Sequence, residues 1–312
     1  MVLYVVGAGA TGTLFAARLS EAGHAVQLID RTARVAGSFT LTVEGERPGE
    51  FTVDRAPAAQ GGPPADGVLL AVKTFDLAAA AASVARSVAP APTLAPQNGL
   101  GVETLAERGL TEGGWPHPRT VLVRAIHSIP ATWLGPGRVR QAGDGEFVLP
   151  AEGAEAAPAV DRWAEWVKTM GYRVRRVPDF PREVWRKVLV NAAINPVTAD
   201  LRVPNGRLRE DPWRGQALRL LEEARAVAAA EGQAFTVDEA EADLWKVVRA
   251  TAQNHSSMLQ DIERGRPTEV EAISGEIVAR ADHHGIPVPA TRRALQRLRE
   301  RGRQATGPAR GA

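Results

Sequence analysis

The sequence predicts an α/β protein in two parts, a parallel-sheet domain over residues 1–178 and an all-helical domain over residues 179–312. In the first half, apolar strands alternate with helical patterns, as in a parallel sheet with helices on both faces. From about Pro178 onward, apolar residues recur at helical spacing with few strand signals. A chain of 312 residues is also too long for one ordinary core.

The strands expected in the sheet share short apolar runs. They are Val2–Val6, Ala25–Ile29, Gly67–Val72, Thr93–Ala95 and Thr120–Ile126. Helices should follow two of them, one over Ala10–Ala22 that Gly23 closes, and an alanine-rich one after Thr74.

Between these elements, alternating residues predict hairpins and Pro/Gly clusters predict loops. Phe39–Val43 and Phe51–Val53 form the expected surface hairpin, and another is expected around Gly137–Leu149. The loops are expected at Ala56–Pro64 and Gly109–Pro118.

Capping boxes mark helix starts in the second half. Thr236 with Glu239 opens a long helix that ends near Gly265, and Thr268 with Glu271 opens the next. The basic run from Arg292 to Arg303 is expected to be a solvated helix, with a frayed tail from Ala305 to Ala312.

Composition excludes several classes of protein. Cysteine is absent, and the six histidines lack metal-ligand spacing, so no metal site is expected. A net charge of +2 indicates no nucleic-acid or membrane partner, and no apolar run is long enough to cross a bilayer. The N-terminus enters a strand directly, so we expect no targeting peptide and a cytoplasmic protein.

Lysine is rare. Only four of the 38 basic residues are lysines, namely Lys73, Lys168, Lys187 and Lys246. Arginine cannot release a proton at usable pH, whereas a partly desolvated lysine can. Each lysine is therefore a candidate for proton chemistry.

A glycine-rich turn joins the first strand to the first helix. It reads Gly7, Ala8, Gly9, Ala10, Thr11, Gly12, which matches G-x-G-x-x-G. The first glycine permits the tight turn, the second lets the backbone approach a pyrophosphate, and the third allows close helix–strand packing. The helix N-terminus faces the anion. In this context the motif predicts a Rossmann-type dinucleotide-binding domain.

The end of the second strand leaves the choice of dinucleotide open. Asp30 stands where an acid would bind the adenosine ribose diol of NAD. Arg31, with Arg34 nearby, would instead bind the 2′-phosphate of NADP.

Polar residues line one face of an apolar helix in the second half. Lys187, Asn191 and Asn195 recur every four residues among valines and leucines. Such a stripe is satisfied either by other protein groups or by a ligand in a cleft. Asn254 and Ser257 share a face of the long helix, although Ser257 could also bond to its own helix.

Motifs along the chain resemble those of one family. Val72-Lys73-Thr74, Gln97-Asn98-Gly99, Trp185-Arg-Lys187-x₃-Asn191-x₃-Asn195-Pro196, Pro204-Asn205-Gly206, Asn254-x-Ser-Ser257-Met-Leu-Gln-Asp261 and Pro267-Thr-Glu269 resemble, in this order, those of ketopantoate (2-dehydropantoate) reductases. The resemblance runs from residue 1 to about residue 300, and the later motifs are far more specific than the glycine turn.

The resemblance implies a function and the roles of individual residues. It implies reduction of ketopantoate to pantoate with NADPH in pantothenate biosynthesis, with Lys187 as proton donor. Cofactor-binding residues are implied at Gly7 to Gly12, Arg31, Lys73, Asn98 and Glu269. Substrate-binding residues are implied at Asn98, Lys187, Asn191, Asn195, Asn205 and Ser257. Glu269 is expected to couple electrostatically with Lys187.

Two other functions stay open. One is an NAD(P)H-dependent reductase of another 2-keto acid or an opine-type substrate on the same scaffold. The other is a non-catalytic NADPH sensor, which would need none of Lys187, Ser257 and Glu269. The sequence does not set the oligomeric state, and a homodimer is compatible with it.

Overall fold

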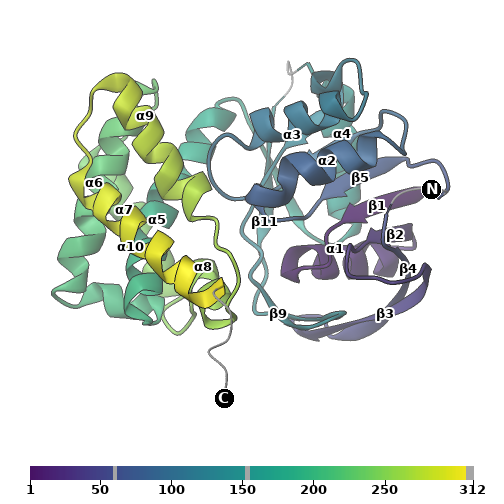
Figure 1. Cartoon of the computed structure of the whole chain (residues 1–312), viewed down its shortest axis with the longest axis horizontal. Coiled ribbons are helices and arrows are strands. Elements are labelled where there is room, and N and C mark those ends of the chain that lie inside the picture. The colour runs from purple at the N-terminus through teal and green to yellow at the C-terminus, as the bar shows by residue number, and fades with distance from the viewer. Residues whose placement is uncertain (59–61, 152–154, 307–312) are drawn as a thin grey trace. The chain divides into compact units, whose positions relative to one another are not determined.

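The structure is a computed structural model that describes residues 1–58, 62–151 and 155–306. The chain divides into two compact units. The first comprises Met1–Gln97 and Gly101–Phe180, and the second comprises Asn98–Leu100 and the chain from Pro181 onward. The first unit carries the parallel sheet and the second is helical, so the predicted fold class is confirmed (Figure 1).

The main sheet has nine strands in the order β7-β6-β5-β1-β2-β4-β3-β10-β9. Its strands are β1 (Val2–Val6), β2 (Ala25–Ile29), β3 (Gly37–Gly45), β4 (Gly49–Ala56), β5 (Gly67–Leu70), β6 (Thr93–Ala95), β7 (Leu122–Arg124), β9 (Ala131–Gly135) and β10 (Arg138–Gln141). The run from β7 to β4 is parallel throughout. A second sheet has the order β12-β11-β8, from β8 (Ile126–His127), β11 (Glu146–Pro150) and β12 (Arg173–Val177).

Alternate side chains of β1 are buried in two different cores, because successive side chains of a strand point to opposite faces of the sheet. Leu3 and Val5 join one cluster with helices α1 (Ala10–Glu21) and α4 (Ala157–Thr169). Tyr4 and Val6 join the other, with α2 (Leu77–Ala85) and α3 (Val102–Glu112), which lie side by side in Figure 1. The sheet is therefore covered on both faces.

The first predicted hairpin is confirmed in its pairing but not in its surface position, and the second is wrong in its bounds. β3 and β4 do pair antiparallel, but β4 also pairs with β2, and Leu41, Val43 and Val53 are buried, so this hairpin belongs to the sheet rather than the surface. No hairpin spans Gly137–Leu149: β10 pairs with β9 and β3, whereas β11 pairs with β8 and β12. The β9–β10 pairing is a local hairpin, whereas the pairings of β10 with β3 and of β11 with β8 and β12 are long-range, so local alternation could not reveal them.

The strand predicted over Thr120–Ile126 is split between the two sheets as β7 and β8. The loop predicted over Gly109–Pro118 is wrong in its first part, because α3 continues to Glu112. A Cβ on Gly109 would lie 2.2 Å from the Ala78 carbonyl oxygen of α2, so this glycine serves close helix packing. Residues 59–61 of the predicted Ala56–Pro64 loop lie outside the described residues.

A fully buried arginine ties the outer strands to α1. Arg18 is 0% exposed, and its guanidinium donates to Gln141 Oε1 and to the carbonyls of Glu46 and Arg47 at 2.8–3.3 Å. Its Nη1 also pairs with Glu21 at 3.0 Å. Apart from the Glu21 carboxylate, every acceptor here is a backbone carbonyl or the buried Gln141 amide, so this guanidinium fastens α1 to β10 and to the turn between β3 and β4.

Arg18→Met is expected to reduce the free energy of unfolding by about 2–4 kcal/mol, because the Glu46 and Arg47 carbonyls each lose a donor and the buried Gln141 amide oxygen is left with the longer hydrogen bond from the Tyr172 hydroxyl. Urea denaturation of the purified protein would measure the loss. Arg140→Met is the matched control, since Arg140 is 56% exposed in its pair with Glu44 and should change stability by less than about 1 kcal/mol. Equal effects of the two substitutions would contradict this role for Arg18.

The second unit is a helical bundle. Its elements are α5 (Phe180–Leu201), η3 (Asn205–Arg209), α6 (Trp213–Ala230), α7 (Val237–Ala250), α8 (Ser257–Glu263), the π-helical turn η4 (Glu271–Gly275), α9 (Glu276–His284) and α10 (Pro289–Thr306). Thr236 caps α7 as predicted, its side chain accepting from the Glu239 amide at 3.1 Å. The long helix to Gly265 is wrong, because the helix breaks after Ala250 and restarts at Ser257.

The predicted capping box at Thr268 is also wrong in detail. Thr268 Oγ1 accepts from the Val270 amide at 3.4 Å, but Glu271 pairs with Arg299 on α10.

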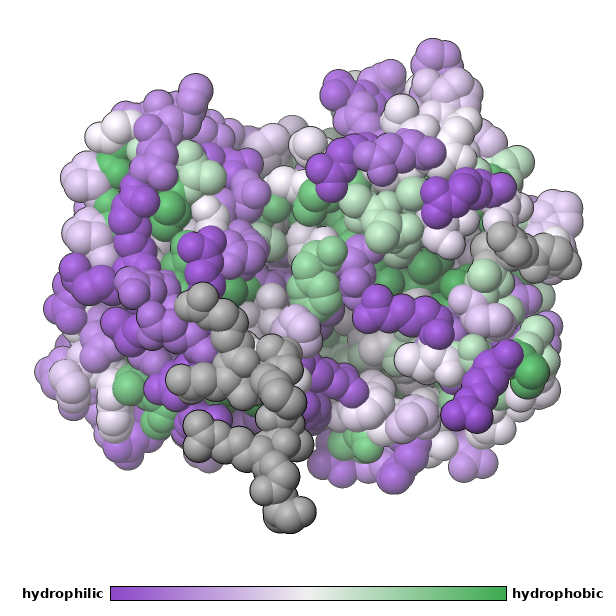
Figure 2. Space-filling view, in the orientation of Figure 1, coloured by the Kyte–Doolittle hydropathy of each residue, from purple (hydrophilic) through white to green (hydrophobic). Residues whose placement is uncertain are grey.

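The basic run forms the expected helix, α10, and two more of its arginines, Arg297 and Arg301, pair with Asp200 of α5. Figure 2 shows a largely hydrophilic surface here. Residues 307–312 of the predicted tail lie outside the described residues. Among the described residues, no helix is long and apolar enough to span a bilayer.

Candidate active site

The glycine turn has the geometry that its motif predicts. Gly7 has a φ of +109°, and its amide donates to the Ile29 carbonyl of β2 at 2.8 Å. A Cβ on Gly12 would lie 1.8 Å from the Gly7 carbonyl oxygen, so α1 and the turn are in direct contact. A Cβ on Gly9 would meet no described heavy atom within 4 Å. Packing therefore explains the glycines at positions 7 and 12 but not at position 9.

The first turn of α1 suits an anion. Gly9 is its N-cap and offers no side chain to accept from the amides of the first turn. Such amides, together with the helix dipole, bind phosphate well. The open approach at Gly9 and the uncapped 12-residue helix behind it therefore fit a dinucleotide pyrophosphate.

Charged residues follow the carboxyl ends of β2 and β5. Arg31 is 78% exposed and its Nη2 lies 3.1 Å from Asp76 Oδ2. Lys73 precedes the short helix η1 (Thr74–Asp76), and its carbonyl accepts from the Asp76 amide at 3.0 Å. Asp30 is buried, and although burial would raise its pKa, hydrogen bonds from Thr32 and the charge of Arg55 hold the pKa below its ordinary value.

In the helical unit, α5 carries the predicted polar stripe on a single unbroken helix. Lys187 and Asn191 are half-buried, and Asn195 is buried. Apolar neighbours of the stripe are buried throughout: Val188, Leu189, Val190 and Ile194. The helix thus presents an amine and two amides on one side of an otherwise apolar segment.

Asn205 is hydrogen-bonded to the segment between α7 and α8. Its amide donates to the Asn254 carbonyl at 3.0 Å, and its Nδ2 donates to Thr251 Oγ1 at 2.9 Å. Its Oδ1 is buried and accepts no hydrogen bond from the described residues. Asn205 therefore retains one acceptor for a further donor while its other groups hold the break in place.

Asn254 and Ser257 do not share a helix face, contrary to the prediction. Asn254 lies in the break, Ser257 is the first residue of α8, and both are exposed. The N-cap is Ser256, whose Oγ accepts from the Leu259 amide at 3.2 Å and lies 2.7 Å from Thr198 Oγ1 of α5. Ser256 and Thr198 thus link α8 to α5, a role that the sequence-based prediction missed. The Ser-x-x-Leu spacing before an apolar run was its only signal.

Glu269 and Asn98 come together in the second unit, where Asn98 Nδ2 donates to Glu269 Oε2 at 3.4 Å. The π-helical turn that follows Glu269 explains the position of Asn98. The Glu276 amide donates to the Glu271 carbonyl, five residues back, and not to the Ala272 carbonyl as in an α-helix. The Ala272 carbonyl accepts instead from the Leu100 amide at 2.9 Å.

Gly99 is required for this contact. Its φ is +94°, and a Cβ would lie 2.3 Å from the Ala272 carbonyl oxygen. The segment Asn98–Leu100 is therefore fastened by its backbone, which leaves the Asn98 side chain beside the buried carboxylate of Glu269.

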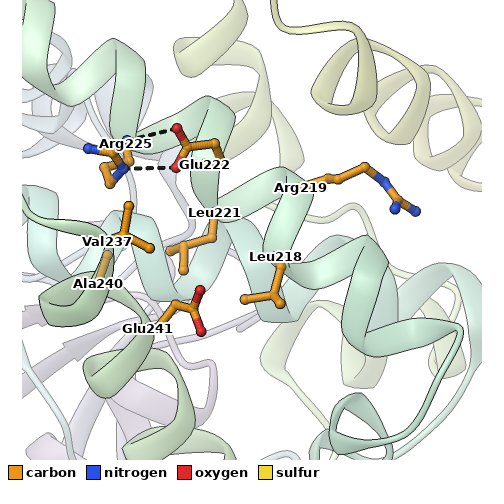
Figure 3. A pocket seen from close by; sticks show the side chains of 8 residues that line it. All are labelled: Leu218, Arg219, Leu221, Glu222, Arg225, Val237, Ala240 and Glu241. Atoms are coloured by element: carbon orange, nitrogen blue, oxygen red, sulfur yellow. Dashed lines mark hydrogen bonds and ion pairs between the residues drawn. The ribbon is translucent and has the colours of Figure 1, made fainter.

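A separate pocket lies between α6 and α7, seen in Figure 3. Its volume is about 250 Å³, and apolar side chains such as Leu221 and Val237 stand beside an ion pair between Glu222 and Arg225. None of the predicted site residues lines it. Among the described residues, no group of three His, Asp or Glu side chains could hold a metal ion.

Comparison with known proteins finds one family over both parts of the chain. The family model described as ketopantoate reductase PanE/ApbA matches residues 3–153, and the model of its C-terminal part matches residues 179–302. The 2-dehydropantoate 2-reductase of Archaeoglobus fulgidus is 32% identical over 297 residues, which cover 95% of this chain and 96% of the relative.

Solved structures show the same architecture. A PanE/ApbA family ketopantoate reductase from Ralstonia eutropha JMP134 aligns with a TM-score of 0.83 at 30% identity, covering 98% of this chain and 99% of that one. D-Mandelate dehydrogenase with NADH and anilino(oxo)acetate aligns with a TM-score of 0.87 at 21% identity, covering 98% and 99%, and shares the fold. The chain belongs to the ketopantoate reductase family and is an oxidoreductase of that family.

Proposed function

We propose that this protein reduces ketopantoate to pantoate with NADPH, with Lys187 as the proton donor. The observation that carries the proposal is the stripe on α5, where a half-buried lysine and two asparagines share one side of a buried helix. Relatives of 2-dehydropantoate 2-reductase activity match nearly the whole chain, which supports the same substrate class.

The nucleotide is proposed to bind at the glycine turn. Gly7, Ala8, Gly9, Ala10, Thr11 and Gly12 would surround the pyrophosphate, with Arg31 and Lys73 near the adenosine phosphate and Asn98 and Glu269 near the other end. NADPH bound there would supply a hydride to the ketone carbon of the substrate. The uncapped amides of α1 support this site, since they favour an anion.

Lys187 is proposed to serve the ketone oxygen. As a hydride reaches the carbon, negative charge grows on that oxygen, and an ammonium group within reach stabilises the charge and donates a proton. Only a group with a labile proton can do both, which favours lysine over arginine at this position. Glu269 is proposed to keep Lys187 in its charged form.

The remaining polar residues are proposed to orient the substrate. Ser257, at the exposed start of α8, would bind the carboxylate. Asn98, Asn191, Asn195 and Asn205 can both donate and accept, as hydroxyl groups require. The buried Oδ1 of Asn205, which accepts from none of the described residues, supports such a role, since a buried acceptor costs free energy until a donor reaches it.

A second candidate is a reductase of a different 2-keto acid. The structural likeness to D-mandelate dehydrogenase, a protein of the same fold with an aryl analogue bound, favours keeping it. We also propose that the domain boundary lies near residue 178 and that the protein assembles as a homodimer.

A panel of 2-keto acids, each assayed with NADPH and with NADH, is expected to give the highest kcat/KM for ketopantoate with NADPH. An aryl or unbranched 2-keto acid as the best substrate would favour the second candidate. Binding of NADPH in a thermal-shift assay without turnover of any substrate would indicate a sensor and contradict the proposed function.

A further inference from the structure

Asp30 directly follows β2, at the position where an acid binds a ribose diol in NAD-dependent proteins of this fold. Here its carboxylate is already occupied. Oδ1 accepts from the Thr32 amide at 2.9 Å and from Thr32 Oγ1 at 2.8 Å. Oδ2 accepts from Arg55 Nε at 3.0 Å and lies 2.7 Å from Arg55 Nη2.

These contacts use the full capacity of the carboxylate. An ionised carboxylate offers about four lone-pair sites, and four donor groups surround this one. The residue is also only 7% exposed. A ribose diol would therefore have to displace a buried ion pair before Asp30 could bind it.

Arg55 is held where this pairing requires it. It lies on β4, opposite Leu28 of the parallel neighbour β2, and the Asp30 amide donates to the Ala56 carbonyl at 2.9 Å. Its guanidinium stacks on the ring of Phe39, with 4.3 Å from Cζ to the ring centroid. Backbone register and an aromatic face thus orient the side chain independently of any ligand.

We propose that Arg55 sets the nucleotide preference of this protein by occupying Asp30. With its carboxylate bound and its charge compensated, Asp30 neither accepts from a 2′-hydroxyl nor repels a 2′-phosphate, and Arg31 is left to attract that phosphate. Arg55 is a positioning residue in this scheme, because it acts through Asp30. The inference rests on the proposed function, since it presupposes an adenine dinucleotide at the glycine turn.

Calorimetric titration with two nucleotide fragments tests the inference without any measurement of turnover. The full-length protein is titrated with 2′,5′-ADP, which carries the 2′-phosphate, and with 5′-ADP, which carries the diol. The wild-type protein is expected to prefer 2′,5′-ADP by about tenfold or more. Arg55→Gln is expected to reduce this preference by about tenfold or more, because an uncompensated Asp30 repels the phosphate and accepts from the diol.

Three further variants separate this role from a merely structural one. Adding Asp30→Asn to Arg55→Gln should restore most of the lost preference, and Arg55→Lys should retain most of it. Asp30→Asn alone, a nearly isosteric change, should alter the affinity for 5′-ADP by less than about threefold, because Asp30 is already occupied by Arg55 and does not bind the diol. Arg140→Gln is the matched control. Arg140 forms an exposed ion pair with Glu44, so its substitution should leave the affinity for both fragments unchanged.

The outcomes are distinct. If Arg55→Gln lowered the affinity for both fragments equally, and adding Asp30→Asn did not restore the preference, Arg55 would only support the fold. That result would overturn the inference. A loss of tenfold or more in 5′-ADP affinity in Asp30→Asn alone would show that Asp30 binds the diol in the wild-type protein and would overturn the inference too, even if Arg55→Gln fails to fold. Failure of the wild-type protein to bind either fragment would instead overturn the proposed function, and the inference with it.

Discussion

Lys187→Ala is expected to lower kcat by about 10²–10⁴-fold while NADPH affinity stays within a few-fold of wild type. The substitution removes the ammonium group that we propose to stabilise the developing oxyanion and to supply its proton. Most of the lysine's neighbours on α5 are buried apolar residues, so loss of the side chain leaves the helix packing largely intact. Steady-state kinetics with ketopantoate, together with a fluorescence titration of NADPH, would measure both quantities.

Two variants make the Lys187 result specific. Lys187→Arg should retain charge but donate no proton, so it should restore substrate affinity more than kcat. Lys246→Ala, at an exposed position of α7 in the same unit, is the matched control and should leave kcat unchanged. Near wild-type turnover in Lys187→Ala would remove this residue from the mechanism.

Gly12→Ala is expected to destabilise the first unit by about 4 kcal/mol or more. The added Cβ would lie 1.8 Å from the Gly7 carbonyl oxygen and 3.1 Å from the Ala71 side chain, so both the turn and α1 would have to move. Thermal and urea unfolding would measure the loss. Nucleotide affinity should disappear along with the turn geometry.

The neighbouring glycine provides the contrast. Gly9 has a φ of −76°, which alanine adopts without strain, and its Cβ would meet no described atom within 4 Å. Gly9→Ala should therefore change stability by less than about 1 kcal/mol but weaken nucleotide binding about tenfold or more, because the methyl group would keep a pyrophosphate from the backbone. Equal losses of stability in the two variants would contradict this division of roles.

The elements that local pattern determines were predictable. The strands β1, β2 and β6 and the helix α1 lie within one residue of their predicted bounds, because apolar periodicity and glycine punctuation coincide there. The polar stripe of α5 was also predictable, since spacing of four places residues on one helix face.

What the sequence could not reveal depends on long-range contacts. The break between α7 and α8 contains neither proline nor glycine, and it is held by backbone hydrogen bonds from Asn205 and Gly206 to the Asn254 and Ala252 carbonyls. The partner of Asp30 is 25 residues away on a neighbouring strand, and nothing in the local sequence marks Arg55 as that partner. The sequence therefore left the choice of dinucleotide open at a residue whose charged partner lies on another strand.

The π-helical turn at Glu271–Gly275 limits which deletions this part of the chain can tolerate. Such a turn holds one residue more than the α-helical turn it replaces. A single-codon deletion there would restore regular helical pairing, and the Ala272 carbonyl would then accept from its own helix. The amide of Leu100 would lose its acceptor, although it is encoded some 170 codons upstream. A reading-frame-preserving deletion would here release the chain segment that carries Asn98.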